Sequence, residues 1–293
     1  MRRFWAIART TALELISEPF VMLVLLSALA LSALAPAIHY HQFGEPTRMA
    51  RDAGLSALLV GGLVVAVFGA VKAMRDEFES GTVLTVLSHS VSRTRFFLAK
   101  TAGVALVYLL VALAISGNAL TMVNAAEIAS RLRVENSRIA AVYGPSLALS
   151  VAASVVPLVA GAALNRFARF RFTPTATLLA VGIAVAGTFF RFDPALAGRT
   201  LPVYALGSLP ALLPLAAAAA FATRLRTNAA SALTALVFAA FLPSLGNYCL
   251  ADVRPGGEAG LWRFFALAAL ALVPAVAAML ALGVKLINGR DIG

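Results

Sequence analysis

The chain is short of charged residues, and this shortage is the first constraint on its class. Charged side chains make up 13% of its 293 residues, whereas 61% of the residues are hydrophobic. A water-soluble domain carries about 25% charged residues. A chain with so few cannot cover its own surface with polar groups, so we expect lipid to form part of its solvent.

Cysteine is almost absent as well. The single cysteine, Cys249, excludes a disulfide within the chain and any cysteine-rich metal site. The sequence also lacks the pattern Gly-x-x-x-x-Gly-Lys-Ser/Thr, which forms the phosphate-binding loop of P-loop proteins. If ATP drives this protein, a separate chain must bind the nucleotide and its magnesium ion. We expect this chain to bind no cofactor of its own.

Acidic residues are missing from the middle of the apolar runs. Transporters driven by protons or sodium ions usually carry ionisable groups at mid-membrane, because those groups relay the ion. Their absence argues against ion coupling and against a membrane enzyme that needs paired carboxylates. His39 and His41 form a weak metal pair without a nearby cysteine or carboxylate cluster, so we predict no metal site.

Long apolar runs are what the sequence does contain. About 20 mostly apolar residues are needed for a helix to cross a bilayer. Eight runs approach that length: 20–38, 54–73, 101–123, 145–165, 174–190, 201–222, 228–250 and 264–286. The fifth is short, and prolines in the sixth (Pro202, Pro210, Pro214) predict a kinked or re-entrant segment. We therefore predict an all-α fold, a single transmembrane bundle over residues 1–293 with six to eight spans.

Lysines and arginines predict the orientation of the bundle. The net charge of +11 comes from short basic clusters between the apolar runs, which is typical of membrane orientation rather than of nucleic-acid binding. With eight spans and a cytoplasmic N-terminus, most of the 24 basic residues fall in the cytoplasm. Both termini are then cytoplasmic, and residues 124–144 form an external loop or helix. A bacterial inner membrane fits this composition.

Residues 1–19 predict an amphipathic helix that lies on the membrane surface. At 100° per residue, Phe4, Trp5 and Leu15 fall on one side of this helix, and the arginines fall mostly on the other. Pro19 then ends the helix before the first span.

The segment between the second and third apolar runs, residues 75–100, is the most informative. Acidic residues lie at its start, Gly81 permits a sharp turn, and Thr82 is a good N-cap. The apolar residues of 83–87 predict a short amphipathic helix, and Ser92 is placed to cap the helix that follows. A short helix beside acidic residues suits docking into a groove on a soluble partner.

Several residues of this segment form a pattern: Glu77, Glu79, Gly81, Thr82, Leu87, Ser88, Val91, Ser92, Arg93 and Lys100. The pattern resembles that of type-2 ABC transporter permeases. The N-terminal surface helix and the ending Asn288-Gly289-Arg290-Asp291 are also similar to that family. The resemblance is good over residues 1–125, and beyond them it rests on topology.

The resemblance implies the membrane-spanning permease subunit of an ATP-driven exporter. It implies a dimer with a second copy or a sibling, each permease docking on an ABC ATP-binding subunit. The residues expected to couple the subunits are Glu77, Glu79, Gly81, Thr82, Leu84, Leu87, Ser88 and Arg93. Two alternatives remain open. One is an integral membrane enzyme acting on lipid or polyprenyl substrates, and the other is a non-catalytic membrane assembly subunit.

Polar residues elsewhere have structural interpretations. Arg166, Arg169 and Arg171 alternate with phenylalanines, which predicts a cytoplasmic anchor beside anionic lipid or a second, smaller docking loop for the ATPase. Asparagines such as Asn118 and Asn124 lie in the apolar runs or near them. We interpret them as interhelical hydrogen-bonding groups rather than as the lining of a substrate path.

Overall fold

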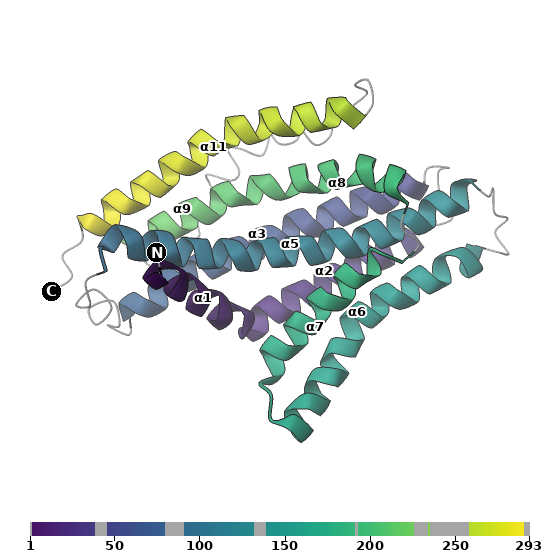
Figure 1. Ribbon diagram of the computed structural model, residues 1–293, viewed down its shortest axis with the longest axis horizontal. Helices are drawn as coiled ribbons and strands as arrows, with labels where there is room; N and C mark the ends of the chain where they lie inside the picture. Colours follow the sequence, from purple (N-terminus) through teal and green to yellow (C-terminus); the bar gives the residue numbers. More distant parts are fainter. Residues whose placement is uncertain are drawn as a thin grey trace. The chain divides into compact units, whose positions relative to one another are not determined.

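The computed structural model describes residues 2–38, 46–79, 91–131, 139–190, 193–225, 234 and 258–289. Every element within these residues is a helix, which agrees with the predicted all-α class (Figure 1). The α-helices are α1 (Arg2–Ile16), α2 (Pro19–Ile38), α3 (Pro46–Glu79), α5 (Arg93–Arg131), α6 (Ile139–Ala168), α7 (Phe172–Gly187), α8 (Pro194–Ser208), α9 (Leu212–Ala222) and α11 (Glu258–Asn288). A short 3-10 helix, η3 (Leu209–Ala211), joins α8 to α9.

Four helical segments in the described residues are long and apolar enough to cross a membrane. They are α3, α5, most of α6 (Ala141–Ala168) and the run from α8 through α9 (Pro194–Ala222). A fifth is added if the broken pair α1 and α2 counts as one span. The chain thus has the helices of an integral membrane protein.

Several predicted apolar runs fall inside these helices. Runs 54–73, 101–123 and 145–165 lie within α3, α5 and α6, which all extend further at both ends. α5 continues to Arg131, so the first part of the predicted external segment 124–144 is helical. Run 228–250 lies outside the described residues apart from Thr234. The count of six to eight spans therefore stays a prediction.

The chain divides into two compact units, each with its own packing. Unit 1 comprises Met1–Leu15, Leu63–Tyr108 and Leu206–Gly293, and unit 2 comprises Ile16–Gly62 and Leu109–Ala205. Helices α3, α5 and α8 contribute residues to both units, and α1 contributes its last residue, Ile16, to unit 2. The predicted coupling residues belong to unit 1, and the basic loop at 166–171 belongs to unit 2.

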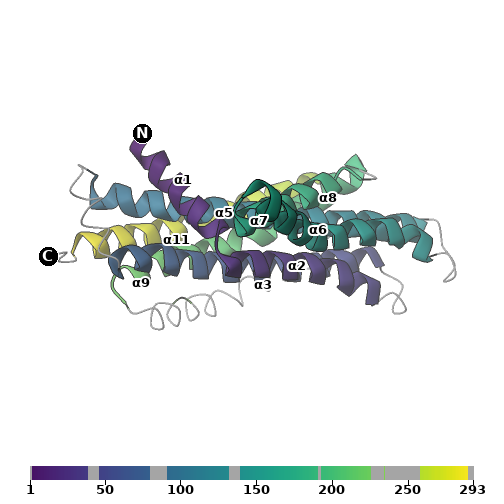
Figure 2. The same cartoon turned by 90° about the horizontal axis from the view of Figure 1, so that it is seen from below.

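In unit 1, α9 packs along α11 (Figure 1 and Figure 2). The alanines 216–220 of α9 are all buried, and such small side chains let helices approach closely. Gly283 of α11 lies against the ring of Phe97 on α5, where no space remains for a Cβ atom. Close helix packing in unit 1 thus depends on small residues.

One side of α1 is buried against glycines of the same unit. A Cβ atom on Gly103 of α5 would lie 2.5 Å from the Ala8 carbonyl oxygen and 2.8 Å from the Thr11 Cβ. A Cβ atom on Gly69 of α3 would lie 3.3 Å from Leu15. Part of the side predicted to be apolar is therefore covered by protein. The position of α1 relative to a membrane stays a prediction.

The proline-rich run 201–222 is helical with one 3-10 turn. Pro210 lies in η3, and the Leu212 backbone N–H donates to the Leu209 carbonyl instead of that of Ser208. The hydroxyl of Tyr108 on α5 donates to the Ser208 carbonyl. Membrane helices tolerate such breaks when neighbouring side chains satisfy the carbonyls that are released.

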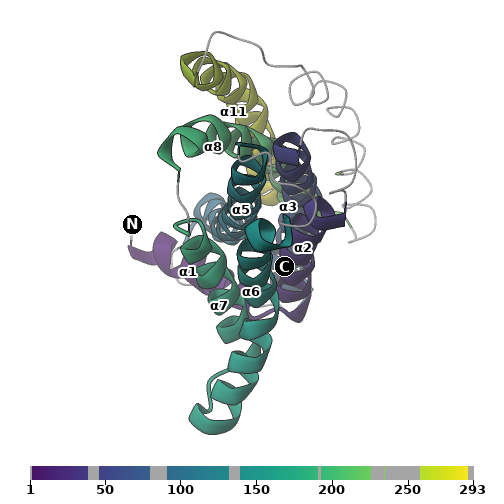
Figure 3. The ribbon, with the colours of Figure 1, turned by 90° about the vertical axis from the view of Figure 1, so that its right-hand side faces the viewer.

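In unit 2, α2, α6 and α7 pack together, and α6 and α7 form a hairpin (Figure 1 and Figure 3). A Cβ atom added to Gly161 of α6 would lie 3.2 Å from the Ala176 Cβ and 3.4 Å from the Phe172 ring of α7, so the two helices approach closely there. Only 22% of the apolar window of α6 is buried, against 56–67% in the three other candidate spans. α6 therefore leaves a large apolar surface for lipid or another helix.

Candidate functional site

The predicted coupling segment is described at both of its ends. α3 continues to Glu79, and the description resumes at Val91, two residues before α5 begins at Arg93. Five of the predicted residues lie outside the described part of the chain: Gly81, Thr82, Leu84, Leu87 and Ser88. Their docking role and the short helix at 83–87 remain predictions.

The start of α5 is capped as the sequence predicts. The Ser92 Oγ accepts a hydrogen bond from the Arg95 backbone N–H at 3.3 Å, and the Ser92 carbonyl accepts one from Phe96 at 3.0 Å. A serine at this position satisfies a donor that the first helical turn leaves without an intrahelical partner. α5 therefore begins at a defined residue within the coupling segment.

Glu77 is held by a buried lysine. The Lys100 Nζ lies 2.5 Å from Glu77 Oε1 and 3.7 Å from Glu14 Oε2. The Lys100 side chain is 5% exposed, and its Nζ lies 6.0 Å from the ring centroid of Phe96. A charge buried this deeply needs a partner, because losing its water costs several kcal/mol. Glu77 is therefore the counter-ion that permits the burial of Lys100, and the pair joins α3 to α5.

Glu79 is paired within its own helix. The Arg75 guanidinium donates to Glu79 Oε1 through Nε at 3.0 Å and also through Nη2. The same guanidinium donates through Nη1 to the Leu225 carbonyl at 2.8 Å. Charge-assisted hydrogen bonds of this kind are about twice as strong as neutral ones. Arg75 thus links the end of α3 to the residues that follow α9.

Two arginines bind the C-terminal end of α11. Arg93 Nη1 donates to the Asn288 carbonyl at 3.3 Å. Arg224 donates through Nε to the Leu286 carbonyl at 3.4 Å and through Nη2 to the Gly289 carbonyl. The last carbonyls of a helix have no intrahelical donor and carry partial negative charge, so cations stabilise them. Asn288 opens the C-terminal sequence that resembles type-2 permeases, and its carbonyl therefore binds Arg93, the first residue of α5.

These contacts all lie within unit 1, and we call their charged side chains the coupling cluster. Its side chains are Glu14, Arg75, Glu77, Glu79, Arg93, Lys100 and Arg224. The cluster brings together three of the predicted coupling residues, Glu77, Glu79 and Arg93. Glu77 and Glu79 each have a basic partner inside the chain, Lys100 and Arg75. Their contacts hold helices together at both ends of the coupling segment.

The sequence did not identify the pairing partners of this cluster. Lys100 was identified only as a member of the pattern that resembles type-2 permeases, and no partner was predicted for it or for Arg75 and Arg224. Glu77 and Lys100 are 23 residues apart, and Arg75 and Leu225 are 150 apart, so no helical spacing connects them. A usable signal was present at Lys100, because a charge seven residues inside an apolar helix has to find a partner.

The basic loop of unit 2 is fully exposed. Arg166 lies in the last turn of α6, and Arg169 and Arg171 follow the helix. Arg169 has a positive φ of 57°, and the Asn165 Nδ2 donates to the Phe170 carbonyl at 2.7 Å. The side chains of the three arginines and of Phe167 and Phe170 are all exposed. The lipid-anchor and second-docking interpretations both remain predictions.

Two buried asparagines of α5 have different environments. Asn118 Nδ2 donates to the Leu29 carbonyl at 2.9 Å and to Ser32 Oγ at 2.8 Å, which confirms an interhelical hydrogen bond to α2. The Asn124 side chain is equally buried, but neither its nitrogen nor its oxygen has a hydrogen-bond partner in the described part of the chain. The predicted interhelical role therefore holds for Asn118 and is not seen for Asn124.

Among the described residues, no group of three His, Cys, Asp or Glu side chains is placed to hold a metal ion. His39 and His41 lie outside those residues.

Comparison with known proteins finds no relative: no family model, no curated protein and no solved structure matches the chain.

Proposed function

We propose that the chain is the membrane-spanning permease subunit of an ATP-driven ABC exporter, with six to eight spans and cytoplasmic termini. The observation that carries this proposal is the coupling cluster. Glu79 ends α3 and Arg93 begins α5, so the coupling segment is attached to the cluster at both ends. In this proposal the chain catalyses no reaction, and ATP and magnesium bind to the partner subunit.

A force on the coupling segment would reach several helices at once. The Glu77–Lys100 pair connects α3 to α5, and Arg93 connects α5 to the end of α11. Because charged hydrogen bonds fix these ends, the connected helices move as a body rather than one by one. Movement of packed helices as bodies is a common way to change access to a site.

The proposal includes a second permease copy or a sibling, and membrane lipid. α6 supports this part, because most of its apolar window is not buried within the chain. In a membrane, such a surface packs against lipid or against another helix. The exposed arginines 166, 169 and 171 supply positive charge at the tip of the α6–α7 hairpin, which suits an anchor beside anionic lipid.

A cross-linking experiment tests the proposal. Cys249 is the only cysteine, so Cys249→Ser gives a cysteine-free background. Ser88→Cys places a thiol in the predicted docking helix. Ser130→Cys places one at an exposed residue of the predicted external segment. Each variant is treated in native membranes with a thiol-to-amine cross-linker, and the adducts are identified by mass spectrometry.

The expected result is an adduct between position 88 and a chain that carries a phosphate-binding loop, with no such adduct from position 130. An equal adduct from both positions, or none from position 88, would contradict the proposal.

A further inference from the structure

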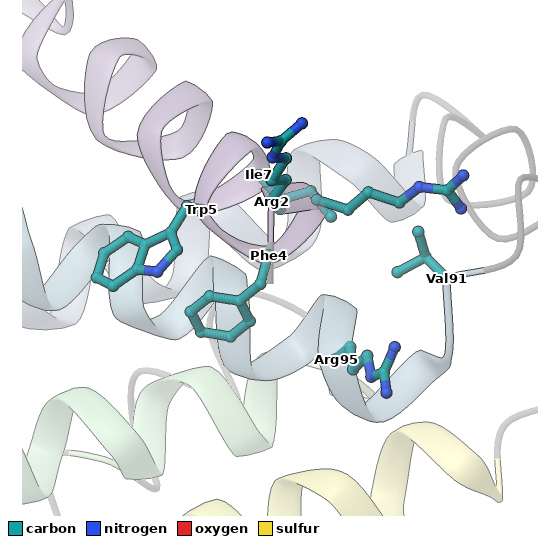
Figure 4. A pocket seen from close by; sticks show the side chains of 7 residues that line it. Arg2, Phe4, Trp5, Ile7, Val91 and Arg95 are labelled. Atoms are coloured by element: carbon teal, nitrogen blue, oxygen red, sulfur yellow. The ribbon is translucent and has the colours of Figure 1, made fainter.

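A pocket of about 710 Å³ lies in unit 1, between the first turns of α1 and the start of α5 (Figure 4). Three arginines line it: Arg2 and Arg3 from α1, and Arg95 from α5. In Figure 4, Phe4 and Trp5 extend from α1, and Arg95 comes from the first turn of α5. The pocket therefore combines positive charge with an aromatic wall.

The described residues that line the pocket include three arginines and no acidic side chain. Arg2 and Arg95 are both exposed, and neither forms an ion pair with an acid in the residues that the structure describes. Guanidinium groups gathered around one space repel each other and raise the local concentration of anions. The pocket thus favours an anionic ligand.

The remaining lining is apolar. Phe4, Trp5, Ile7 and Val91 contribute it, and the rings of Phe4 and Trp5 pack edge to face with their centroids 5.8 Å apart. The Trp5 side chain is nevertheless 58% exposed. Tryptophan in such a position is typical of the boundary between membrane and water. A free inorganic anion would use the arginines and leave this apolar lining exposed to water.

We propose that this pocket binds an anionic phospholipid. The phosphate lies among the guanidinium groups, which bind phosphate oxygens in a planar, two-pronged geometry. The glycerol and the upper part of the acyl chains cover Phe4, Trp5 and Ile7. The lipid would join α1 to the first turn of α5, which lies in the last part of the coupling segment. The site does not depend on the exporter proposal, because it uses no partner subunit.

Tryptophan fluorescence provides the test. The chain has two tryptophans, Trp5 and Trp262, so Trp262→Phe leaves Trp5 as the sole reporter. The protein is reconstituted in phosphatidylcholine vesicles with an increasing fraction of phosphatidylglycerol brominated on its acyl chains. A parallel titration uses brominated phosphatidylcholine. Bromine quenches a tryptophan that it contacts, so half-maximal quenching reports occupancy beside Trp5.

We expect half-maximal quenching at a severalfold lower fraction of the anionic lipid than of phosphatidylcholine. Arg2→Gln and Arg95→Gln should each weaken this preference about fivefold, as expected for one basic residue at an anionic surface. Arg9→Gln removes the same charge from an exposed position of α1 outside the pocket, and it should leave the preference unchanged.

Three results of the fluorescence experiment would overturn the proposal. The first is equal quenching by both lipids in the parent protein. The second is an equal loss of preference in the Arg9→Gln control and the pocket variants. The third is loss of the preference when inorganic phosphate replaces chloride at matched ionic strength, which would assign the pocket to free phosphate. Native mass spectrometry of the parent protein gives a readout without substitutions, where phosphatidylglycerol should be retained over phosphatidylcholine, and equal retention would also overturn it.

Discussion

Lys100 and Glu77 form the ion pair that joins α5 to α3, with 2.5 Å between Nζ and Oε1 and only 5% of the lysine side chain exposed. Glu14 of α1 approaches the same ammonium group at 3.7 Å. One buried cation thus connects three helices in unit 1. The stability of the coupling cluster should depend on it more than on any surface pair, since exposed ion pairs contribute about 0–1 kcal/mol.

Lys100→Met should destabilise the protein by about 3 kcal/mol, because it leaves Glu77 half-buried without its counter-ion. The measurement is the midpoint of thermal unfolding in detergent. It is obtained from the loss of the folded protein's size-exclusion peak after heating. Lys285→Met is the matched control, since Lys285 is exposed and should tolerate the same change. Combining Lys100→Met with Glu77→Leu should recover part of the loss. An unchanged midpoint in Lys100→Met would show that the pair is not important for stability.

Replacement by leucine should change stability differently at the two buried asparagines of α5. Asn118→Leu removes two hydrogen bonds to α2 and should cost about 1 kcal/mol, the usual scale of hydrogen bonds between membrane helices. Asn124→Leu removes an amide that has no partner in the described residues, so it should be neutral or stabilising. Thermal midpoints of the two variants make the comparison. If Asn124→Leu costs as much as Asn118→Leu, Asn124 has a partner that the packing does not show.

Gly103→Ala should loosen α1, because the added Cβ would lie 2.5 Å from the backbone oxygen of Ala8. Overpacking of this kind costs about 1–3 kcal/mol. Limited trypsin digestion reports the displacement, since Arg9 on the exposed side of α1 should be cleaved faster. The control is Gly182→Ala in α7, where no atom lies within 4 Å of the new Cβ. Equal digestion of Gly103→Ala and the parent would show that α1 does not pack on Gly103.

Two arginines of the α6–α7 loop offer a test of backbone conformation. Arg169 has a φ of 57°, so Arg169→Gly should raise stability by about 1 kcal/mol by removing left-handed strain. Arg166 lies in the last turn of α6, where the same replacement should lower stability by about the same amount. Both variants lose one positive charge, so a shared change in thermal midpoint would point to charge. Opposite changes would point to the backbone.

Much of the helical framework follows from the sequence alone. Apolar runs of span length identify α3, α5 and α6, because a bilayer sets the length of an apolar helix. The break before Pro19 and the Ser92 cap follow from local chemistry that operates over a few residues. The helix ends were less predictable, since α5 continues eight residues beyond the predicted run, through Glu127 to Arg131, and an apolar run does not mark such an end.

Long-range pairing could not be predicted in the same way. Glu77 was identified from a sequence pattern as a coupling residue, and its partner Lys100 emerges only when α3 packs on α5. The pair of Arg75 and Glu79 differs, because its i,i+4 spacing lies within one helix. The burial of one side of α1 likewise depends on Gly69 and Gly103, whose spacing carries no signal of what packs on them. Such contacts depend on tertiary packing, which periodicity does not encode.

The central claim is that this chain docks on a separate ATP-binding subunit, and co-purification tests it most directly. The protein is solubilised from its native membrane, purified by affinity, and analysed by mass spectrometry for stoichiometric partners. We predict that a P-loop ATPase accompanies the parent protein. Leu84→Glu in the predicted docking helix should abolish this association. Leu13→Glu, at an exposed leucine of α1, should preserve it. A parent protein that remains without any P-loop ATPase, even after gentle cross-linking in the membrane, would contradict the account.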